Sequence, residues 1–205
     1  MKIKTIFLYL IFSLVLFPFS KGWAQLTSGI YSNGLCVAYD SAHQILTGYF
    51  EGEAGFDEQT QQPLFSCVFY FEGHGIDSLI SIKSYYPFEE KPDTILGTIK
   101  IKNAQTFEMK LEEEHGGCWN VSHFAEQANE FKLEENRNWK WISYIIYPDA
   151  TIYDEPSDKK TVIQKIKKPI VVFVDAIKGD WCFIHFDSKP TTQGWIKKRS
   201  LFIPK

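Results

Sequence analysis

The feature that most restricts the fold is a two-residue alternation of side chains that recurs through the first two thirds of the chain. In the clearest case, Phe65, Cys67, Phe69 and Phe71 share one face of a single extended segment. Side chains alternate between faces in a β-strand, whereas an amphipathic helix needs a period near 3.6 residues. Aromatic residues make up 16% of the chain, and such residues suit half-buried pleated surfaces. The sequence therefore predicts an all-β protein.

Turn signals separate these alternating segments at short intervals. Asn, Gly and Gln cluster at residues 33–34, 73–75 and 103–105. Six to eight antiparallel strands at this spacing predict a barrel or meander that is closed or nearly closed, because closure removes exposed sheet edges. The row of phenylalanines Phe65, Phe69 and Phe71 predicts an interior filled by side chains.

The start of the chain predicts export. Two lysines precede an apolar run over residues 6–19, and the small residues Gly22 and Ala24 follow it. This order is typical of a secretory signal peptide, here residues 1–24, with a mature chain from Gln25. A run of about 14 apolar residues is short for a membrane span, so no stable span is expected after cleavage. We expect a periplasmic or secreted protein.

Charge is distributed unevenly along the mature chain. Residues 25–138 hold 7 Lys and Arg against 18 Asp and Glu, and residues 139–205 hold 12 against 7. An acidic front and a basic back predict two domains, at 25–135 and 139–205, joined by the polar linker Leu133–Asn138. The basic part is either a solvated surface that attracts the acidic one or a face for an anionic envelope polymer. Nucleic acid is not expected as a partner.

Four cysteines, at positions 36, 67, 118 and 182, leave several pairings open. Alternation places Cys182 on a core face, where a thiol is a small apolar filler. The remaining three can form one bridge. Cys67–Cys118 is the preferred pair, with Cys36 buried outside the bridge, and Cys36–Cys118 is the alternative.

Three interpretations compete for residues 112–123, which combine acidic, glycine, cysteine and histidine residues. His115, Cys118 and His123 with a nearby Glu could bind zinc, although their spacing matches no standard zinc site. Cys118 could instead be a nucleophile, but no helix pattern follows it. We favour a structural role: a Gly-Gly turn, half of a disulfide, and Trp119 anchoring the barrel end. No metal and no cofactor are expected.

The end of the chain carries three short motifs in a row of further strands. They are Tyr153–Pro156, Gly179–Trp181 and Gly194–Ile196. In this order, over about 62 residues from Trp141 to Phe202, the chain resembles the bacterial SH3-like family. The resemblance implies a small SH3-like β-barrel that serves as a recognition domain.

In such domains exposed aromatic residues line a shallow groove for peptides. The resemblance therefore nominates Tyr153, Trp181, Phe183 and Trp195 as ligand-binding residues. Flat rings provide a large contact area at low entropic cost. The competing interpretation is that Tyr153 and Trp195 simply plug the barrel. His185 is expected to be an ordinary surface histidine.

These observations favour an exported, non-enzymatic binding protein of the cell envelope. Its SH3-like domain would recognise cell-wall peptide or an envelope protein. One alternative is a periplasmic inhibitor or immunity protein whose acidic N-terminal barrel faces a basic target. Another is a small-ligand carrier. No arrangement of residues typical of an enzyme is apparent, and the sequence specifies no oligomeric state.

Overall fold

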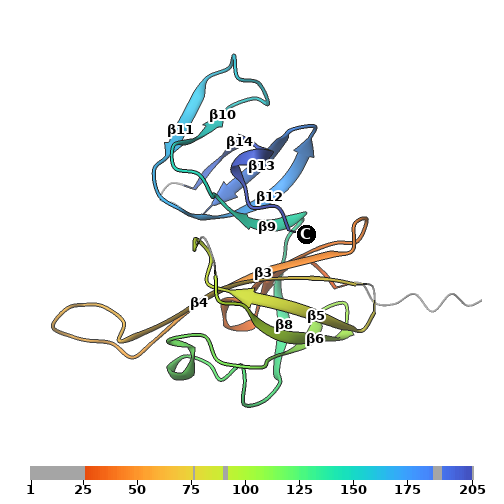
Figure 1. The fold of residues 1–205 in the computed structure, drawn as a ribbon, viewed down its shortest axis with the longest axis vertical. Helices are drawn as coiled ribbons and strands as arrows, with labels where there is room; N and C mark the ends of the chain where they lie inside the picture. The colour runs from red at the N-terminus through yellow and green to blue at the C-terminus, as the bar shows by residue number, and fades with distance from the viewer. Residues whose placement is uncertain (1–25, 76, 90–91, 187–190, 205) are drawn as a thin grey trace, which may run out of the picture.

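The computed structural model describes residues 26–75, 77–89, 92–186 and 191–204 (Figure 1). The predicted signal peptide lies outside these residues. The described chain is built from β-strands and three single-turn 3₁₀ helices. No helix in these ranges has the length and apolar character needed to cross a membrane. The prediction of an all-β fold is confirmed.

The first eight strands form a closed antiparallel barrel. They are β1 (Gly29–Tyr31), β2 (Cys36–Asp40), β3 (Ile45–Ala54), β4 (Phe65–His74), β5 (Leu79–Tyr85), β6 (Ile95–Asn103), β7 (Thr106–Leu111) and β8 (Asn129–Asn136). Each strand pairs with its sequence neighbour, and β1 also pairs with β8. The 3₁₀ helix η1 (Ser32–Gly34) joins β1 to β2, and η2 (Cys118–Asn120) lies between β7 and β8.

The barrel interior is packed with aromatic rings, as the alternation predicts. Phe50, Phe69 and Phe124 contact one another with ring centroids 5.0–5.5 Å apart. Phe71 and Phe131 are buried in the same core. Such a filled interior argues against the small-ligand carrier.

Phe65 does not belong to this core, and the prediction that it fills the barrel was wrong. Its side chain is 42% exposed although it has the same strand parity as Phe69. The reason is that the β3–β4 ladder is longer than the barrel wall. Phe65 pairs with Ala54 at the far end of the β3–β4 ladder, whereas β5 pairs with β4 only from Tyr70 onward. Phe65 therefore lies beyond the barrel wall.

The remaining strands form a six-stranded sheet in the order β11-β10-β14-β13-β12-β9. Their bounds are β9 (Trp141–Tyr144), β10 (Ala150–Tyr153), β11 (Val162–Ile166), β12 (Val171–Lys178), β13 (Trp181–Phe186) and β14 (Thr192–Lys197), with the 3₁₀ helix η3 (Lys198–Ser200) after β14. Cys182, Ile184 and Phe186 point into the core of this sheet. Cys182 is the buried filler that alternation predicts, and burial raises its thiol pKa to about 11.

The predicted linker Leu133–Asn138 is mostly strand. β8 continues to Asn136, which pairs with Gly29 and so helps to close the barrel. The error has a simple cause. Outward positions of this strand carry charged residues, while Phe131 and Leu133 pack against the core, so the inward pattern is short.

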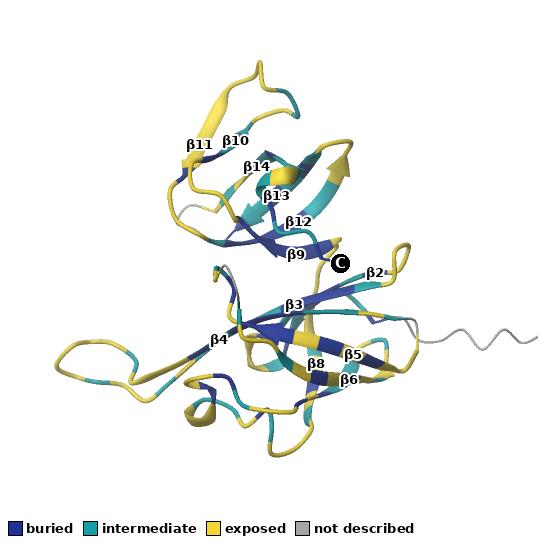
Figure 2. Cartoon of the chain, in the orientation of Figure 1, coloured by how far each residue is buried: buried dark blue, intermediate teal, exposed yellow. Residues whose placement is uncertain are grey.

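The barrel and the second sheet pack directly on one another. A shared cluster contains Tyr70 from β4, Ile142 and Tyr144 from β9, and Phe173 from β12. Figure 2 shows dark-blue, buried strands on both sides of this boundary. Cys36 is half-buried at the edge of the same cluster rather than buried in the barrel.

Candidate functional site

The four aromatic residues nominated by the sequence lie on one face of the second sheet. Tyr153 ends β10, Trp181 and Phe183 belong to β13, and Trp195 belongs to β14. They occupy the strand positions that alternate with the core residues, and all four side chains are half-buried. The sequence therefore folds one row inward and leaves one aromatic row on the outer face.

Strand register brings these rings into contact. Trp195 lies opposite both Tyr153 on β10 and Phe183 on β13. The Phe183 and Trp195 rings meet edge to face with centroids 5.3 Å apart, and Tyr153 and Trp181 do so at 5.4 Å. We call Tyr153, Trp181, Phe183 and Trp195 the aromatic face. Edge-to-face contacts hold the rings in fixed orientations while one side of each stays accessible.

A lysine borders the aromatic face. Lys197 pairs across the strands with Trp181, and its ammonium nitrogen lies 5.1 Å from the Trp181 ring centroid. The same nitrogen donates a hydrogen bond to the Asp158 carboxylate. A cation over a tryptophan ring is attracted by the ring's π electrons. Lys197 thus links the aromatic face to a charged rim.

An open cleft continues from this rim. Its lining includes Tyr147, Tyr153, Asp158, Lys197 and Arg199. Two of these residues also belong to the aromatic face or border it, so the rings and the cleft form one surface. The surface combines apolar rings with groups of both charges, which suits an extended peptide with polar termini or side chains.

The sequence interpretation missed Tyr147 and Arg199. Tyr147 directly precedes Pro148, and Arg199 follows the Gly194–Ile196 motif by three residues. In the structure neither residue belongs to a strand, because β9 ends at Tyr144 and β14 ends at Lys197. Only the folding of η3 against the β9–β10 connection brings them to the same cleft.

His185 is not the ordinary surface histidine that the sequence suggested. Its Nδ1 lies 2.7 Å from an Asp175 carboxylate oxygen, and its ring stacks on Phe173 at 5.2 Å. Phe173 in turn stacks on Trp139 near the boundary with the barrel. His185 therefore contacts residues of the domain boundary, and it shares the outward face of β13 with Trp181 and Phe183.

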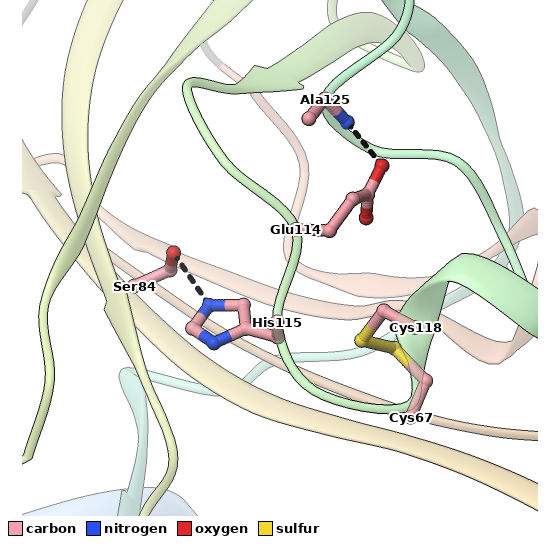
Figure 3. The surroundings of a disulfide bond; sticks show 6 residues. All are labelled: Cys67, Ser84, Glu114, His115, Cys118 and Ala125. Atoms are coloured by element: carbon pink, nitrogen blue, oxygen red, sulfur yellow. Dashed lines mark hydrogen bonds between the residues drawn. A yellow bond between two sulfur atoms is a disulfide. The ribbon is translucent and has the colours of Figure 1, made fainter.

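The second candidate site, residues 112–123, contains a disulfide. Cys118 at the start of η2 is bonded to Cys67 of β4, with Cα atoms 4.4 Å apart (Figure 3). The predicted bridge is confirmed. A sulfur held in a disulfide is neither a thiolate nucleophile nor a zinc ligand, so both rival roles for Cys118 are removed.

The turn before this disulfide requires glycine. Gly117 has a φ of +83°, and a Cβ built on it would lie 2.1 Å from the Ser66 carbonyl oxygen. Trp119, in contrast, does not anchor the barrel end as expected. Its side chain is 54% exposed and meets His123 edge to face.

His115 is a buried structural residue. Its ring stacks on Phe69 at 5.0 Å, and its Nε2 lies 2.9 Å from the Ser84 hydroxyl (Figure 3). Because Ser84 donates its own proton to the Ile95 carbonyl, His115 Nε2 donates to Ser84. Burial lowers the imidazole pKa to about 4, so this ring is neutral at pH 7.

Glu114 turns away from this histidine. One of its carboxylate oxygens accepts a hydrogen bond from the Ala125 backbone N–H at 2.6 Å (Figure 3). The described residues contain no group of three or more histidine, cysteine and acidic side chains placed to hold a metal ion. Residues 112–123 thus have a structural role: Cys118 is bonded to Cys67 of β4, and Glu114 binds the Ala125 backbone in the loop before β8. The aromatic face is the stronger candidate site.

Comparison with known proteins agrees with the geometry of the second sheet. Residues 147–202 match the family model of the bacterial SH3 domain. The matched residues include the whole aromatic face and all the residues that line the cleft beside it. No curated protein and no solved structure matched the chain. Residues 147–202 of the second sheet therefore match a bacterial SH3 domain, a family that suggests a binding module, and the N-terminal barrel has no family match.

Proposed function

We propose that this chain is an exported, non-enzymatic binding protein of the cell envelope, and that the aromatic face of its bacterial SH3 domain holds cell-wall peptide. The observation that carries the proposal is the contact geometry of the four rings. Tyr153, Trp181, Phe183 and Trp195 come from three strands, yet they form one accessible apolar row.

The properties of this row support binding of an extended peptide. Tryptophan and tyrosine bury a large area with few rotatable bonds, so they lose little entropy when a ligand binds. The charged groups of Asp158, Lys197 and Arg199 along the neighbouring cleft would orient the peptide's own charges. An extended segment of an envelope protein has the same chemistry and is the alternative ligand.

Two observations support the extracytoplasmic location and the non-enzymatic role that we propose. A bacterial SH3 domain together with a disulfide indicates an extracytoplasmic protein. The one cysteine that the sequence nominated as a nucleophile, Cys118, is the residue that forms this disulfide. Export by cleavage before Gln25 is the part of the proposal that rests on sequence alone.

The test is saturable retention of the mature chain, from Gln25 onward, on purified peptidoglycan. Trp181→Ala and Trp195→Ala should each weaken retention by about tenfold, the usual range for an aromatic anchor. Trp119→Ala is the matched control, because Trp119 is an exposed tryptophan on the barrel. Circular dichroism should show that all variants stay folded.

Competition identifies the ligand. Soluble stem peptides should displace the protein from peptidoglycan, whereas glycan fragments without peptide should not. Retention no better than background, or equal losses for Trp119→Ala and Trp181→Ala, would contradict wall-peptide binding by the aromatic face.

A further inference from the structure

The hairpin between β3 and β4 extends far beyond the barrel (Figure 1). The two strands pair with each other out to Ala54 and Phe65. On the outer sides, β2 pairs with β3 only as far as Tyr49, and β5 pairs with β4 only from Tyr70. We call residues 51–65 the arm. Its strand edges have no further neighbour among the described strands.

The arm has an ordered tip. The Asp57 carboxylate accepts a hydrogen bond from the Gln59 backbone N–H at 2.8 Å, and Asp57 also forms an isolated bridge with Gln62. An aspartate that binds the backbone two residues ahead stabilises a turn. The arm is thus already shaped for contact, so docking it would lose little conformational entropy.

The surface of the arm is both apolar and acidic. Phe56 and Leu64 are 58% and 57% exposed, and they lie close to the exposed carboxylates of Glu53 and Glu58. Between Lys21 and Lys83 the sequence has no lysine and no arginine. Unpaired strand edges beside exposed apolar side chains are typical of surfaces that another chain covers.

The second sheet has a surface with the opposite charge and a similar apolar content. β11 is an edge strand, and Val162 and Ile163 on it are exposed. An open groove runs beside its end, lined by Lys165, Lys167 and Lys168 together with the apolar residues Ile166, Ile170 and Phe186. Within the described ranges, no carboxylate lies at salt-bridge distance from these three lysines.

We propose that the arm of one molecule docks in the β11 groove of a second copy of this chain. Glu53, at the base of the arm, lines a cavity together with Ile170 of its own molecule. Figure 1 shows that the tip of the arm lies far from β11 of the same molecule, so a contact between the tip and the groove joins two molecules. Glu53 and Glu58 face the lysines of the groove, and Phe56 enters its apolar floor. Each copy offers one arm and one groove, so a two-fold dimer satisfies both surfaces at once.

The first measurement is sedimentation of the mature chain as a function of concentration and salt. The chain should dimerise reversibly at about 50 mM NaCl and dissociate at about 500 mM, because salt screens exposed charge pairs. A chain that stays monomeric at about 0.1 mM protein in low salt overturns the proposal. A monomer is also expected if the arm binds a different, basic protein instead of a second copy of this chain.

Charge reversal then locates the contact. The arm variant Glu53→Lys/Glu58→Lys and the groove variant Lys165→Glu/Lys167→Glu should each weaken the dimer by about tenfold or more. An equimolar mixture of the two should restore it, since each arm then meets a groove of opposite charge. Association that neither reversal changes, or a mixture that stays dissociated, overturns the proposal.

Two further variants separate specific docking from general charge attraction. Glu112→Lys/Glu113→Lys makes the same charge change at exposed positions on the barrel and should leave the dimer unchanged. Phe56→Ser/Leu64→Ser keeps the net charge and should still dissociate the dimer. If Glu112→Lys/Glu113→Lys dissociates the dimer as strongly as the arm reversal does, general charge attraction replaces the docked arm.

Discussion

The side-chain oxygen of Thr47, on the outer surface of the barrel, accepts a hydrogen bond at 2.8 Å from the backbone N–H of Ile142 in the second sheet. The neighbouring Tyr70 hydroxyl donates to the Ile142 carbonyl at 3.1 Å. β9 is an edge strand, so these two groups of Ile142 would otherwise be unpaired. The barrel therefore covers the edge of the second sheet and satisfies its backbone.

Removing this acceptor should destabilise the whole chain. Thr47→Val keeps the shape of the side chain but leaves the buried Ile142 N–H without a partner, at a cost of about 1–3 kcal/mol. Thr98→Val is the control, because Thr98 is an exposed threonine on β6. Urea unfolding would measure both. Equal stabilities for the two variants would show that the hydrogen bond across the boundary contributes nothing.

Loss of the Cys67–Cys118 bridge should be costly as well. The two cysteines are 51 residues apart, and a loop of this size contributes about 4 kcal/mol by restricting the unfolded chain. Cys67→Ala/Cys118→Ala should therefore unfold at much lower urea, and reductant should lower the wild-type midpoint but not that of the double variant. A wild-type midpoint that reductant leaves in place would contradict this prediction.

The buried imidazole of His115 should make stability depend on pH. Its pKa is about 4 in the folded chain and near 6.5 when unfolded, because burial disfavours the charged ring. Below pH 6.5 the unfolded chain takes up a proton on His115 that the folded chain does not bind. The free energy of unfolding should therefore be unaffected by His115 above pH 6.5 and should fall by about 3 kcal/mol as the pH falls towards 4. His115→Gln, which can still donate to Ser84, should flatten this part of the profile. Urea unfolding from pH 7.5 to pH 4 tests it, and parallel profiles for the two proteins would rule out His115 as the source.

Gly48 should tolerate no side chain. It faces the barrel interior opposite Phe71, and a Cβ there would lie 1.9 Å from that ring. Gly48→Ala should force the packed ring to move and destabilise the barrel by about 1–3 kcal/mol. Gly116→Ala is the matched control, since nothing lies within 4 Å of its Cβ position. Thermal unfolding of the two variants should differ clearly, and equal midpoints would mean that Phe71 can yield.

The aromatic face shows which features a local sequence pattern can predict. Alternation along β13 assigns Trp181 and Phe183 to one face and Cys182 to the other, and the structure has this arrangement. The contact of Tyr153 with Trp181 depends on strand order and register, in which β14 separates their strands. The resemblance to the bacterial SH3 domain predicted that these residues form one site, because it implies that strand order.

Tyr70 and Phe65 show what a local sequence pattern does not predict. Alternation correctly puts Tyr70 outside the barrel, yet the residue is fully buried because the second sheet covers it. Phe65 has inward parity, yet it is exposed because the barrel wall stops before it. A period of two residues distinguishes the faces of a strand, but it does not specify what lies against each face.

By itself, the sequence determined the all-β class, the barrel followed by an SH3-like sheet, and the preferred Cys67–Cys118 pair. These follow from short-range alternation, turn residues and one recognisable motif order. Only the tertiary structure decided that Thr47 and Tyr70 hold Ile142, that β8 extends to Asn136, and that residues 51–65 project as an arm. Such features depend on strand lengths and on contacts between residues far apart in the chain, which a local pattern does not encode.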